Sequence, residues 1–260
     1  MWNNNIARQI ETWYNTPQGA FVLDKQHKLV QMLLSGWPRR NRTLLCMGCE
    51  SLWLEMLWHQ GFDTSGFDCV PENLEMAAKH LGHRADFYLG QFDHLPFDDN
   101  SFDYAVLFSV LEHVDDPLPL LREALRVSAK GILLGFFNSC SLYHADNLQP
   151  GINPFRIFRM LNKEAPECRI TARSILLGPR CTWKEKRLYH WINGLPLPFP
   201  IAACMGLHVD LEPRVPLTPL LLQARQKALS VYAHLQPETV AGTTYKYQKN
   251  SVSPKLPNKP

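Results

Sequence analysis

Apolar segments of strand length alternate with helix-like segments between residues 42 and 137. Such a chain builds parallel βαβ units, because each helix must carry the chain back across the sheet before the next strand begins. The alternation therefore predicts an α/β fold, with a doubly wound parallel sheet and helices on both faces. Residues 169–177 show no clear period. The expected strands are 42–47, 64–67, 86–89, 102–107, 131–137 and 201–210, and the expected helices are 24–34, 51–60, 71–81, 117–127, 152–162 and 220–235.

The charge of the chain is concentrated at its C-terminal end. The formal net charge is +3, and residues 236–260 carry four lysines against a single acid, so the rest of the chain sums to zero. A nucleic-acid surface needs clustered basic residues, and we expect no nucleic-acid partner here. The polar, proline-containing composition of residues 237–260 predicts a disordered basic tail after a single domain of residues 1–236.

Cysteine content and hydropathy indicate the compartment. The seven cysteines are an odd number without the paired spacing of a disulfide framework, which is typical of a reducing compartment. No signal-type apolar run follows Met1, and the longest apolar stretches, 131–137 and the proline-broken 195–209, are too short to span a bilayer. We expect a soluble cytoplasmic protein without a membrane partner or a metal site, and the oligomeric state stays open.

One turn is expected to hold a ligand. The apolar run Thr43–Met47 ends at Gly48, and a helix-like pattern follows. A strand that turns into a helix presents free N–H groups and the positive end of the helix dipole at one place, where an anionic ligand group can bind. Three further strand ends, at Asp68, Gly90 and Ser109, are expected at the same carboxyl edge, where open α/β sheets bind ligands.

The residues at these strand ends resemble those of the class I SAM-dependent methyltransferases, particularly the type 11 branch. The strongest combined signal is Leu95-Pro96-Phe97 with Phe102-Asp103, followed at the right distance by Leu111-Glu112-His113-Val114 and a helix start at Asp116-Pro117. The resemblance covers about residues 10–145, through the segments 13–19, 45–49, 66–74, 95–103, 110–117 and 134–142.

The resemblance implies a Rossmann-like methyltransferase fold, with a mostly parallel seven-stranded sheet and an antiparallel C-terminal edge. It divides the domain into N-terminal cap helices (1–41), a cofactor-binding half (42–140) and a substrate or lid half (141–236). The implied cofactor is S-adenosyl-L-methionine (SAM). The implied reaction is an in-line methyl transfer to a small molecule, which depends mostly on proximity and orientation.

Nine positions are implied as cofactor contacts. Asp68, at the end of the second strand, is placed to accept hydrogen bonds from both ribose hydroxyls. Its alternative role is to cap the helix that begins at Pro71. Phe92 could pack on the adenine face or be an ordinary core aromatic residue. The nine positions are Met47, Gly48, Glu50, Asp68, Cys69, Gly90, Gln91, Phe92 and Ser109.

Four positions depart from the family pattern. At the first strand the family has an acid and two further glycines where this chain has Cys46, Glu50 and Leu52. Glu50 could repel the SAM carboxylate, by about 4 kcal/mol for charges about 4 Å apart at an effective dielectric of about 20. Gln91 replaces an Asp that contacts the adenine amino group, and its carbonyl oxygen can still accept from that group.

These departures leave two hypotheses. The chain is either an active methyltransferase with a divergent glycine loop, or a methyltransferase-like binding or regulatory module that has lost efficient cofactor binding.

Several other residues have two interpretations. His113 could act as a general base toward an oxygen or nitrogen nucleophile, or could pack in its loop. Cys46 and Cys49 form a C-x-x-C pair, but a small buried strand residue explains Cys46 better than redox chemistry does. Tyr14 and Thr16 match a family segment that covers the cofactor, or belong to an ordinary surface turn.

Overall fold

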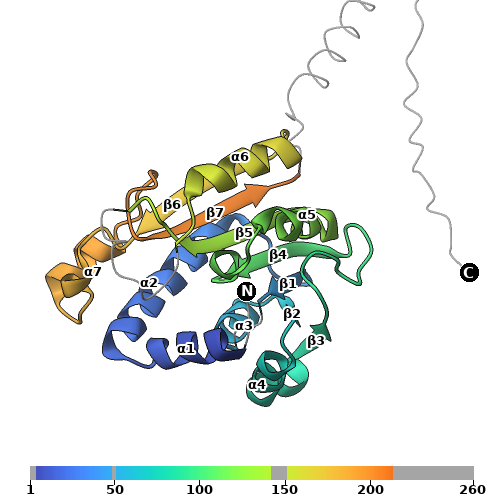
Figure 1. Cartoon of the computed structure of the whole chain (residues 1–260), viewed down its shortest axis with the longest axis horizontal. Coiled ribbons are helices and arrows are strands. Elements are labelled where there is room, and N and C mark those ends of the chain that lie inside the picture. Colours follow the sequence, from blue (N-terminus) through green and yellow to red (C-terminus); the bar gives the residue numbers. More distant parts are fainter. Residues whose placement is uncertain (1–3, 49–50, 142–150, 213–260) are drawn as a thin grey trace, which may run out of the picture. The chain divides into compact units, whose positions relative to one another are not determined.

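The chain forms one seven-stranded sheet with helices packed against it (Figure 1). This structure, a computed structural model, describes residues 4–48, 51–141 and 151–212. In the sheet order β3-β2-β1-β4-β5-β7-β6, the strands are β1 (Thr43–Met47), β2 (Asp63–Asp68), β3 (Ala85–Leu89), β4 (Phe102–Phe108), β5 (Ser128–Phe137), β6 (Arg169–Ile175) and β7 (Cys204–Asp210). The helices are α1 (Asn4–Tyr14), α2 (Pro17–Leu33), α3 (Ser51–His59), α4 (Pro71–Leu81), α5 (Pro117–Val127), α6 (Pro154–Glu164) and α7 (Arg187–Gly194), with short 3-10 turns η1 (Leu34–Gly36), η2 (Gly82–Arg84), η3 (Leu111–His113) and η4 (Arg180–Thr182).

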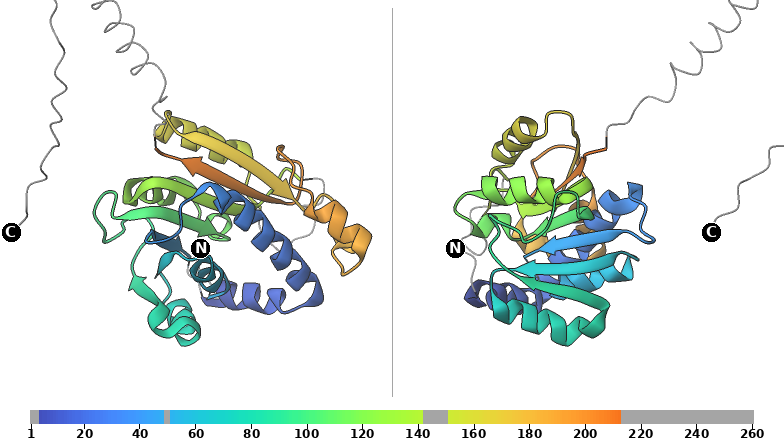
Figure 2. Two further views of the ribbon diagram at one scale, coloured as in Figure 1. Left: turned by 180° about the vertical axis from the view of Figure 1, so that it is seen from behind. Right: turned by 90° about the vertical axis from the view of Figure 1, so that its right-hand side faces the viewer.

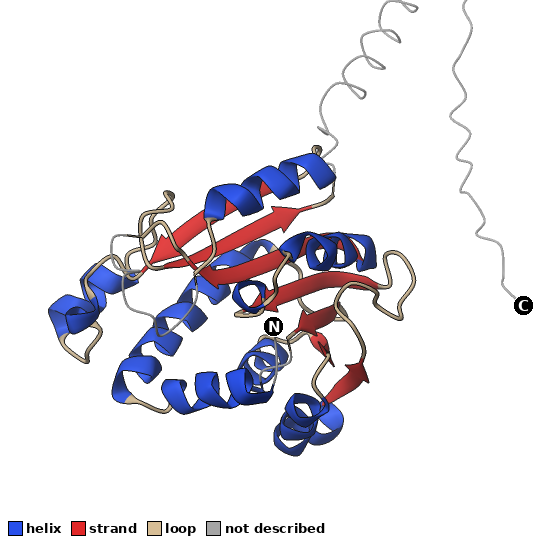
Figure 3. Cartoon of the chain, in the orientation of Figure 1, coloured by secondary structure: helices blue, strands red, loops and turns tan. Residues whose placement is uncertain are grey.

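Strand pairing confirms the predicted fold class. β1 pairs in parallel with β2 and β4, β2 pairs in parallel with β3, and β4 with β5. β7 runs antiparallel to both β5 and β6. The sheet is therefore mostly parallel with an antiparallel C-terminal edge, and its strands lie among the helices in Figure 3.

Successive residues of the central strands face opposite layers of helices (Figure 2). Leu45 and Met47 of β1 belong to the core formed with α5 and α6, whereas Leu44 and Cys46 belong to the core formed with α2, α3 and α4. All four residues are fully buried. A sheet covered on both faces needs apolar side chains at every strand position, which explains why this strand is a continuous apolar run.

Helix α2 begins earlier than the sequence predicts, at Pro17 rather than at residue 24. Thr16 caps it, because its side-chain oxygen accepts a hydrogen bond from the Gly19 N–H at 3.1 Å and Pro17 occupies the first helical position. A Cβ at Gly19 would lie 1.9 Å from the carbonyl oxygen of Trp13. The glycine thus serves the close packing of α1 on α2, where the sequence pattern suggested a surface turn.

The segment without a clear period is an edge strand. β6 pairs with β7 along its whole length, from Arg169 opposite Asp210 to Ile175 opposite Cys204. Only its last two residues are buried, so its side chains carry little periodic signal. Long-range pairing, and not local pattern, makes this segment a strand.

Residues 1–213 form one compact unit. The expected helix 220–235 and the expected basic tail 237–260 lie outside the described residues. In the part of the chain that the structure describes, we find no helix with both the length and the apolar character that a bilayer crossing needs.

Candidate active site

The ends of four neighbouring parallel strands meet at the carboxyl edge of the sheet, as the sequence predicts. Met47 lies opposite both Phe67 and Leu107, and Asp68 lies opposite Leu89. This register brings together residues that are far apart in the sequence. The predicted site positions at this edge are Gly48, Asp68, Gly90 and Ser109.

Two of these strands end in left-handed backbone conformations. Gly48 has a φ of 80°, and a Cβ there would lie 2.9 Å from the Cβ of Val110, so the turn requires a glycine. Its N–H donates to the carbonyl oxygen of Phe67 at 3.0 Å. Ser109 has a φ of 53° and donates its N–H to the carbonyl oxygen of Gly135 at 3.1 Å. Strained backbone of this kind often occurs where a chain must pass close to a ligand.

The carboxylate of Asp68 is hydrogen-bonded within its own turn. Its side chain is fully buried, Oδ1 accepts the Val70 N–H at 2.8 Å, and Oδ2 accepts from the Asn73 side-chain amide at 3.1 Å. These bonds fix the start of α4 at Pro71, so the capping role considered from the sequence is present. A carboxylate offers about four acceptor positions in all. A ribose could reach this group only if the chain that covers it moved.

The residues after β3 form a bend with one exposed amide. Gln91 is exposed, and its carbonyl oxygen accepts the His94 N–H at 3.3 Å. Phe92 is packed in the core, with its ring centroid 5.9 Å from that of Phe67. A Cβ at Gly90 would lie 2.7 Å from the Phe67 ring, so this position also needs a glycine. Gln91 is therefore one of the exposed side chains of this bend, together with Asp93 and His94.

The cysteines near the edge are poor nucleophiles. Burial, helped by the charge of Asp68, raises the pKa of Cys69 to about 11, so this thiol stays protonated at neutral pH. Cys46 is fully buried on β1, as expected of a small strand residue. Its C-x-x-C partner Cys49 and the departing acid Glu50 both lie outside the described residues.

A buried acid lies next to the predicted general base. Burial lowers the pKa of His113, in η3, to about 4, so the ring is neutral and weakly basic at neutral pH. Glu112 Oε1 accepts the Phe137 N–H at 2.6 Å, while its buried Oε2 has no hydrogen-bond partner among the described residues. Burial raises the pKa of Glu112 to about 8. Sequence reasoning misses Glu112, because an acid that turns inward has the same local pattern as an acid in water.

A chain of hydrogen bonds between side chains lies beside the end of β5. The Tyr14 hydroxyl donates to Gln26 Oε1 at 3.0 Å, and the Gln26 amide donates to the Cys204 sulfur at 3.4 Å. Cys204 is the register partner of Phe137, whose N–H donates to Glu112. Burial raises the pKa of the Cys204 thiol to about 12. Tyr14, from the segment that resembles a cofactor cover, is thus tied to the interior of the protein.

Asp103, which belongs to the segment with the strongest resemblance to the family, has a structural role at the amino ends of the parallel strands. Asp103, at the start of β4, pairs with Arg42 at 3.0 Å and with Lys130 at 2.7 Å, and it accepts the Thr43 N–H at 3.1 Å. Burial alone would raise the pKa of Asp103, but these donors and charges outweigh it and lower the pKa. Ser109 ends the same strand at the candidate site. Asp103 therefore stabilises the sheet away from the site.

Three groups at this edge of the sheet are suited to the shape and charge of SAM. The Gly48 turn presents backbone where a Cβ would not fit, Asp68 supplies a carboxylate after β2, and Gln91 supplies an exposed amide after β3. Their order along the edge suits the amino-acid end, the ribose and the adenine amino group. Among residues 4–48, 51–141 and 151–212, no three His, Cys, Asp or Glu side chains are grouped so that they could hold a metal ion.

A family model and a curated relative match parts of the chain. Residues 45–135 match a family described as a methyltransferase domain. Over 122 residues the chain is 25% identical to norajmaline N-methyltransferase from Rauvolfia serpentina, a match that covers 43% of this chain and 42% of that protein. The chain thus spans less than half the length of this relative.

Solved structures share the fold over most of the chain. A SAM-dependent methyltransferase from Thermotoga maritima, described as a possible histamine N-methyltransferase, has a TM-score of 0.59 at 15% identity, covering 80% of this chain and 97% of that chain. Magnesium protoporphyrin IX methyltransferase from Synechocystis, solved with bound SAH, has a TM-score of 0.58 at 13% identity, covering 81% and 96%. Likeness at these identities shows the fold. Residues 45–135 thus match a methyltransferase domain, in a chain that shares its fold with solved SAM-dependent methyltransferases.

Proposed function

We propose that the protein transfers a methyl group from SAM to a small molecule at the carboxyl edge of the sheet. The observation that supports this most is the meeting of Gly48, Asp68, Gln91 and Ser109 at the ends of β1, β2, β3 and β4. SAM supplies a methyl group on a sulfonium, which is a good leaving group. The protein has to bind the cofactor, hold the acceptor in line and exclude water. The free thiols among the described residues agree with a cytoplasmic site of action.

We assign the cofactor contacts in the order of the strands. The backbone of Met47 and Gly48 receives the amino-acid end, Asp68 accepts the ribose hydroxyls, and Gln91 accepts the adenine amino group. The other positions that we propose as cofactor contacts are Glu50, Cys69, Gly90, Phe92 and Ser109.

Where the acceptor must lose a proton, two side chains are candidate general bases. A general base works best when its pKa is close to the working pH. Glu112, with a pKa of about 8, meets this condition better than His113, with a pKa of about 4. His113 remains the candidate that the sequence favours.

Two observations favour the second class of function, a binding or regulatory module without methyl transfer. The Asp68 carboxylate is fully buried and bonded within its own turn, and two glycines of the family loop are replaced by Glu50 and Leu52. A domain with this edge permanently closed could keep the fold without binding SAM.

Calorimetric titration with SAM tests the proposal. Hydrogen bonds to a charged group contribute about 1.5–3 kcal/mol each, so Asp68→Ala should weaken SAM affinity at least about tenfold. Asp63→Ala is a matched control, because it removes an exposed carboxylate from the opposite end of the same strand and should leave the affinity unchanged. Gln91→Ala tests the adenine contact from an exposed position.

Melting temperatures separate lost binding from lost folding, because Asp68→Ala also removes the bonds to Val70 and Asn73. Wild-type protein that gives neither heat nor a thermal shift with millimolar SAM and S-adenosylhomocysteine would overturn the proposed methyl transfer. An unchanged SAM affinity in Asp68→Ala would show that the ribose binds elsewhere.

A further inference from the structure

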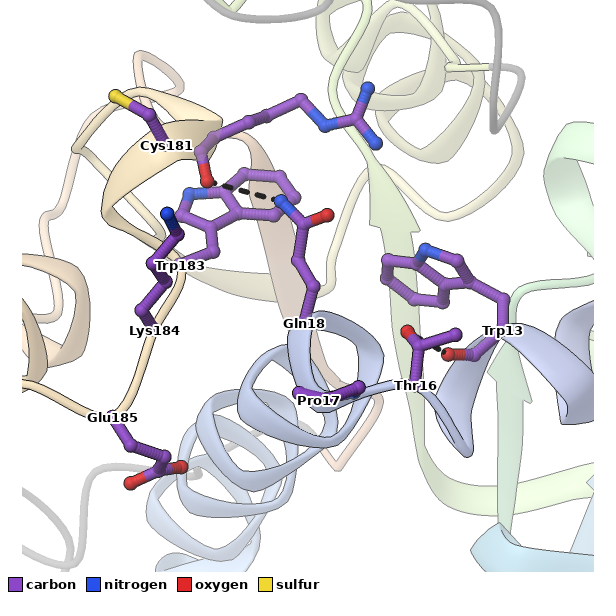
Figure 4. Close-up of a pocket in the computed structure, with 9 residues that line it drawn as sticks. Trp13, Thr16, Pro17, Gln18, Cys181, Trp183, Lys184 and Glu185 are labelled. Carbon is purple, nitrogen blue, oxygen red and sulfur yellow. Dashed lines mark hydrogen bonds between the residues drawn. The ribbon is translucent and has the colours of Figure 1, made fainter.

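A cavity of about 720 Å³ lies between the α1–α2 turn and the segment around η4 (Figure 4). This volume is within the range of about 300–1,000 Å³ that is usual for small-molecule sites. Gln18 bridges the two segments, because its side-chain amide donates to the carbonyl oxygen of Arg180 at 3.0 Å. The cavity is lined by Trp13, Thr16, Pro17, Gln18, Arg180, Cys181, Trp183, Lys184 and Glu185.

Two indole rings, of Trp13 and Trp183, contribute to the apolar lining. The Trp13 ring lies with its centroid 6.2 Å from that of Phe137, the last residue of β5, which connects this lining to the carboxyl edge of the sheet. The Trp183 side chain is buried, and its indole N–H donates to the carbonyl oxygen of Gly178 at 3.0 Å. In Figure 4 the two indoles lie on opposite sides of Gln18. The rings are held by the fold, so a planar ligand would not have to order them.

The charges at the cavity favour an anion. Lys184 supplies an exposed ammonium, and the Arg180 guanidinium lies 5.8 Å from the Trp183 ring centroid. Within the described ranges, no carboxylate pairs with the exposed Lys184 ammonium. Glu185, the single acid among the described residues of the lining, instead contacts His190 Nε2 at 2.7 Å. Its carboxylate points away from Gln18 and Trp183 in Figure 4.

We propose that this cavity binds the methyl acceptor, and that the acceptor is a flat, largely apolar molecule that carries an anionic group, such as an aromatic carboxylate. The inference rests on the proposed methyl transfer and adds the class of substrate. The ring would lie against Trp13 and Trp183, and the anionic group would face Lys184. Two of the proteins named above are described by nitrogen-methylating activities, on norajmaline and, as a possible activity, on histamine. A protonated amine would meet like charges in this cavity.

Three ligands with the same ring and different charge test the proposal on the full chain without SAM: naphthoate, naphthamide and naphthylmethylamine. In calorimetric titration at low ionic strength, we expect naphthoate to bind most tightly and the protonated amine most weakly. An exposed ion pair contributes up to about 1 kcal/mol, so Lys184→Ala should weaken naphthoate binding up to about fivefold and leave naphthamide binding unchanged.

Two further variants make the test specific. Lys186→Ala removes an exposed lysine of the same segment that lies beside the Tyr189 ring and does not line the cavity, and it should leave naphthoate affinity unchanged. Gln18→Trp should fill the cavity and abolish binding of all three ligands with an unchanged melting temperature. Equal or tighter binding of the amine, or equal effects of the two lysine variants, would overturn the proposal.

A separate SAM titration distinguishes failure of this inference from failure of the proposed function. Binding of SAM without binding of naphthoate would overturn the acceptor class and leave methyl transfer standing. Binding of naphthoate without binding of SAM would overturn the acceptor role and leave the cavity as a site for aromatic anions.

Discussion

The carboxyl group of Glu112 has a pKa far from the ordinary value of a glutamate side chain. Burial raises its pKa from 4.5 to about 8, while one oxygen accepts the Phe137 N–H. The folded protein therefore holds a proton at a pH where the unfolded chain has lost it. Since the native state binds more protons, this group stabilises the fold fully below about pH 4.5, and the contribution is lost as pH rises to about 8.

Replacing this acid with its amide should flatten the pH dependence of stability. Glu112→Gln is neutral at every pH, so its free energy of unfolding should fall less between about pH 5 and pH 8 than that of the wild type. One ionising group accounts for at most about 1.4 kcal/mol per pH unit. Urea unfolding at several pH values measures this, with the exposed Glu55→Gln as control. Parallel curves for wild type and Glu112→Gln would contradict the assigned pKa.

At the scale of elements, the junction of α1 and α2 connects the N-terminal helices to the cavity lined by Trp13 and Trp183. The Thr16 hydroxyl donates to the carbonyl oxygen of Trp13 at 2.7 Å and accepts the Gly19 N–H at 3.1 Å. One side chain thus ends the first helix and starts the second. It also fixes the backbone that carries the Trp13 indole.

Removing this cap should destabilise the helix junction. Thr16→Ala should lower the free energy of unfolding by about 1 kcal/mol, whereas Thr16→Ser keeps the hydroxyl and should lose much less. Thr12→Ala is the matched control, because Thr12 lies within α1 and its hydroxyl donates to the Arg8 carbonyl without capping a helix. Thermal unfolding of the three variants measures the difference. An equal loss in Thr12→Ala would show that the capping bond is not the cause.

Across the whole molecule, β5 joins the parallel part of the sheet to its antiparallel edge. It pairs in parallel with β4 on one side and antiparallel with β7 on the other. A Cβ at Gly131 of this strand would lie 2.6 Å from the carbonyl oxygen of Val209 and 2.9 Å from the Trp37 ring. The two parts of the sheet therefore fit together only because this position has no side chain.

Adding one methyl group at this junction should destabilise the fold. Gly131→Ala forces the backbone of β7 or the Trp37 ring to move, and we expect a loss of about 1–3 kcal/mol in the free energy of unfolding. Gly36→Ala is the control, because nothing lies within 4 Å of its Cβ position, and its effect should stay within about 1 kcal/mol. Urea unfolding followed by tryptophan fluorescence measures both variants. Equal stabilities would show that β7 accommodates the added methyl group without cost.

The sequence by itself determines the fold class and the edge where the candidate site lies. Periodicity is local, and the rule that parallel strands need crossover helices turns it into a parallel sheet with a shared carboxyl edge. Gly48, Asp68, Gly90 and Ser109 could therefore be placed together before any coordinates. The segment that supports the family resemblance most, Leu95 to Asp103, is also local.

Only the tertiary structure decides which of these groups have other partners. The Asp68 carboxylate is used by Val70 and Asn73, Glu112 turns inward, and β6 exists because β7 pairs with it. The cavity joins Gln18 to Arg180, which are 162 positions apart in the sequence. Burial, ionisation and cavity shape depend on contacts between distant segments, and such contacts leave no periodic trace in either segment alone.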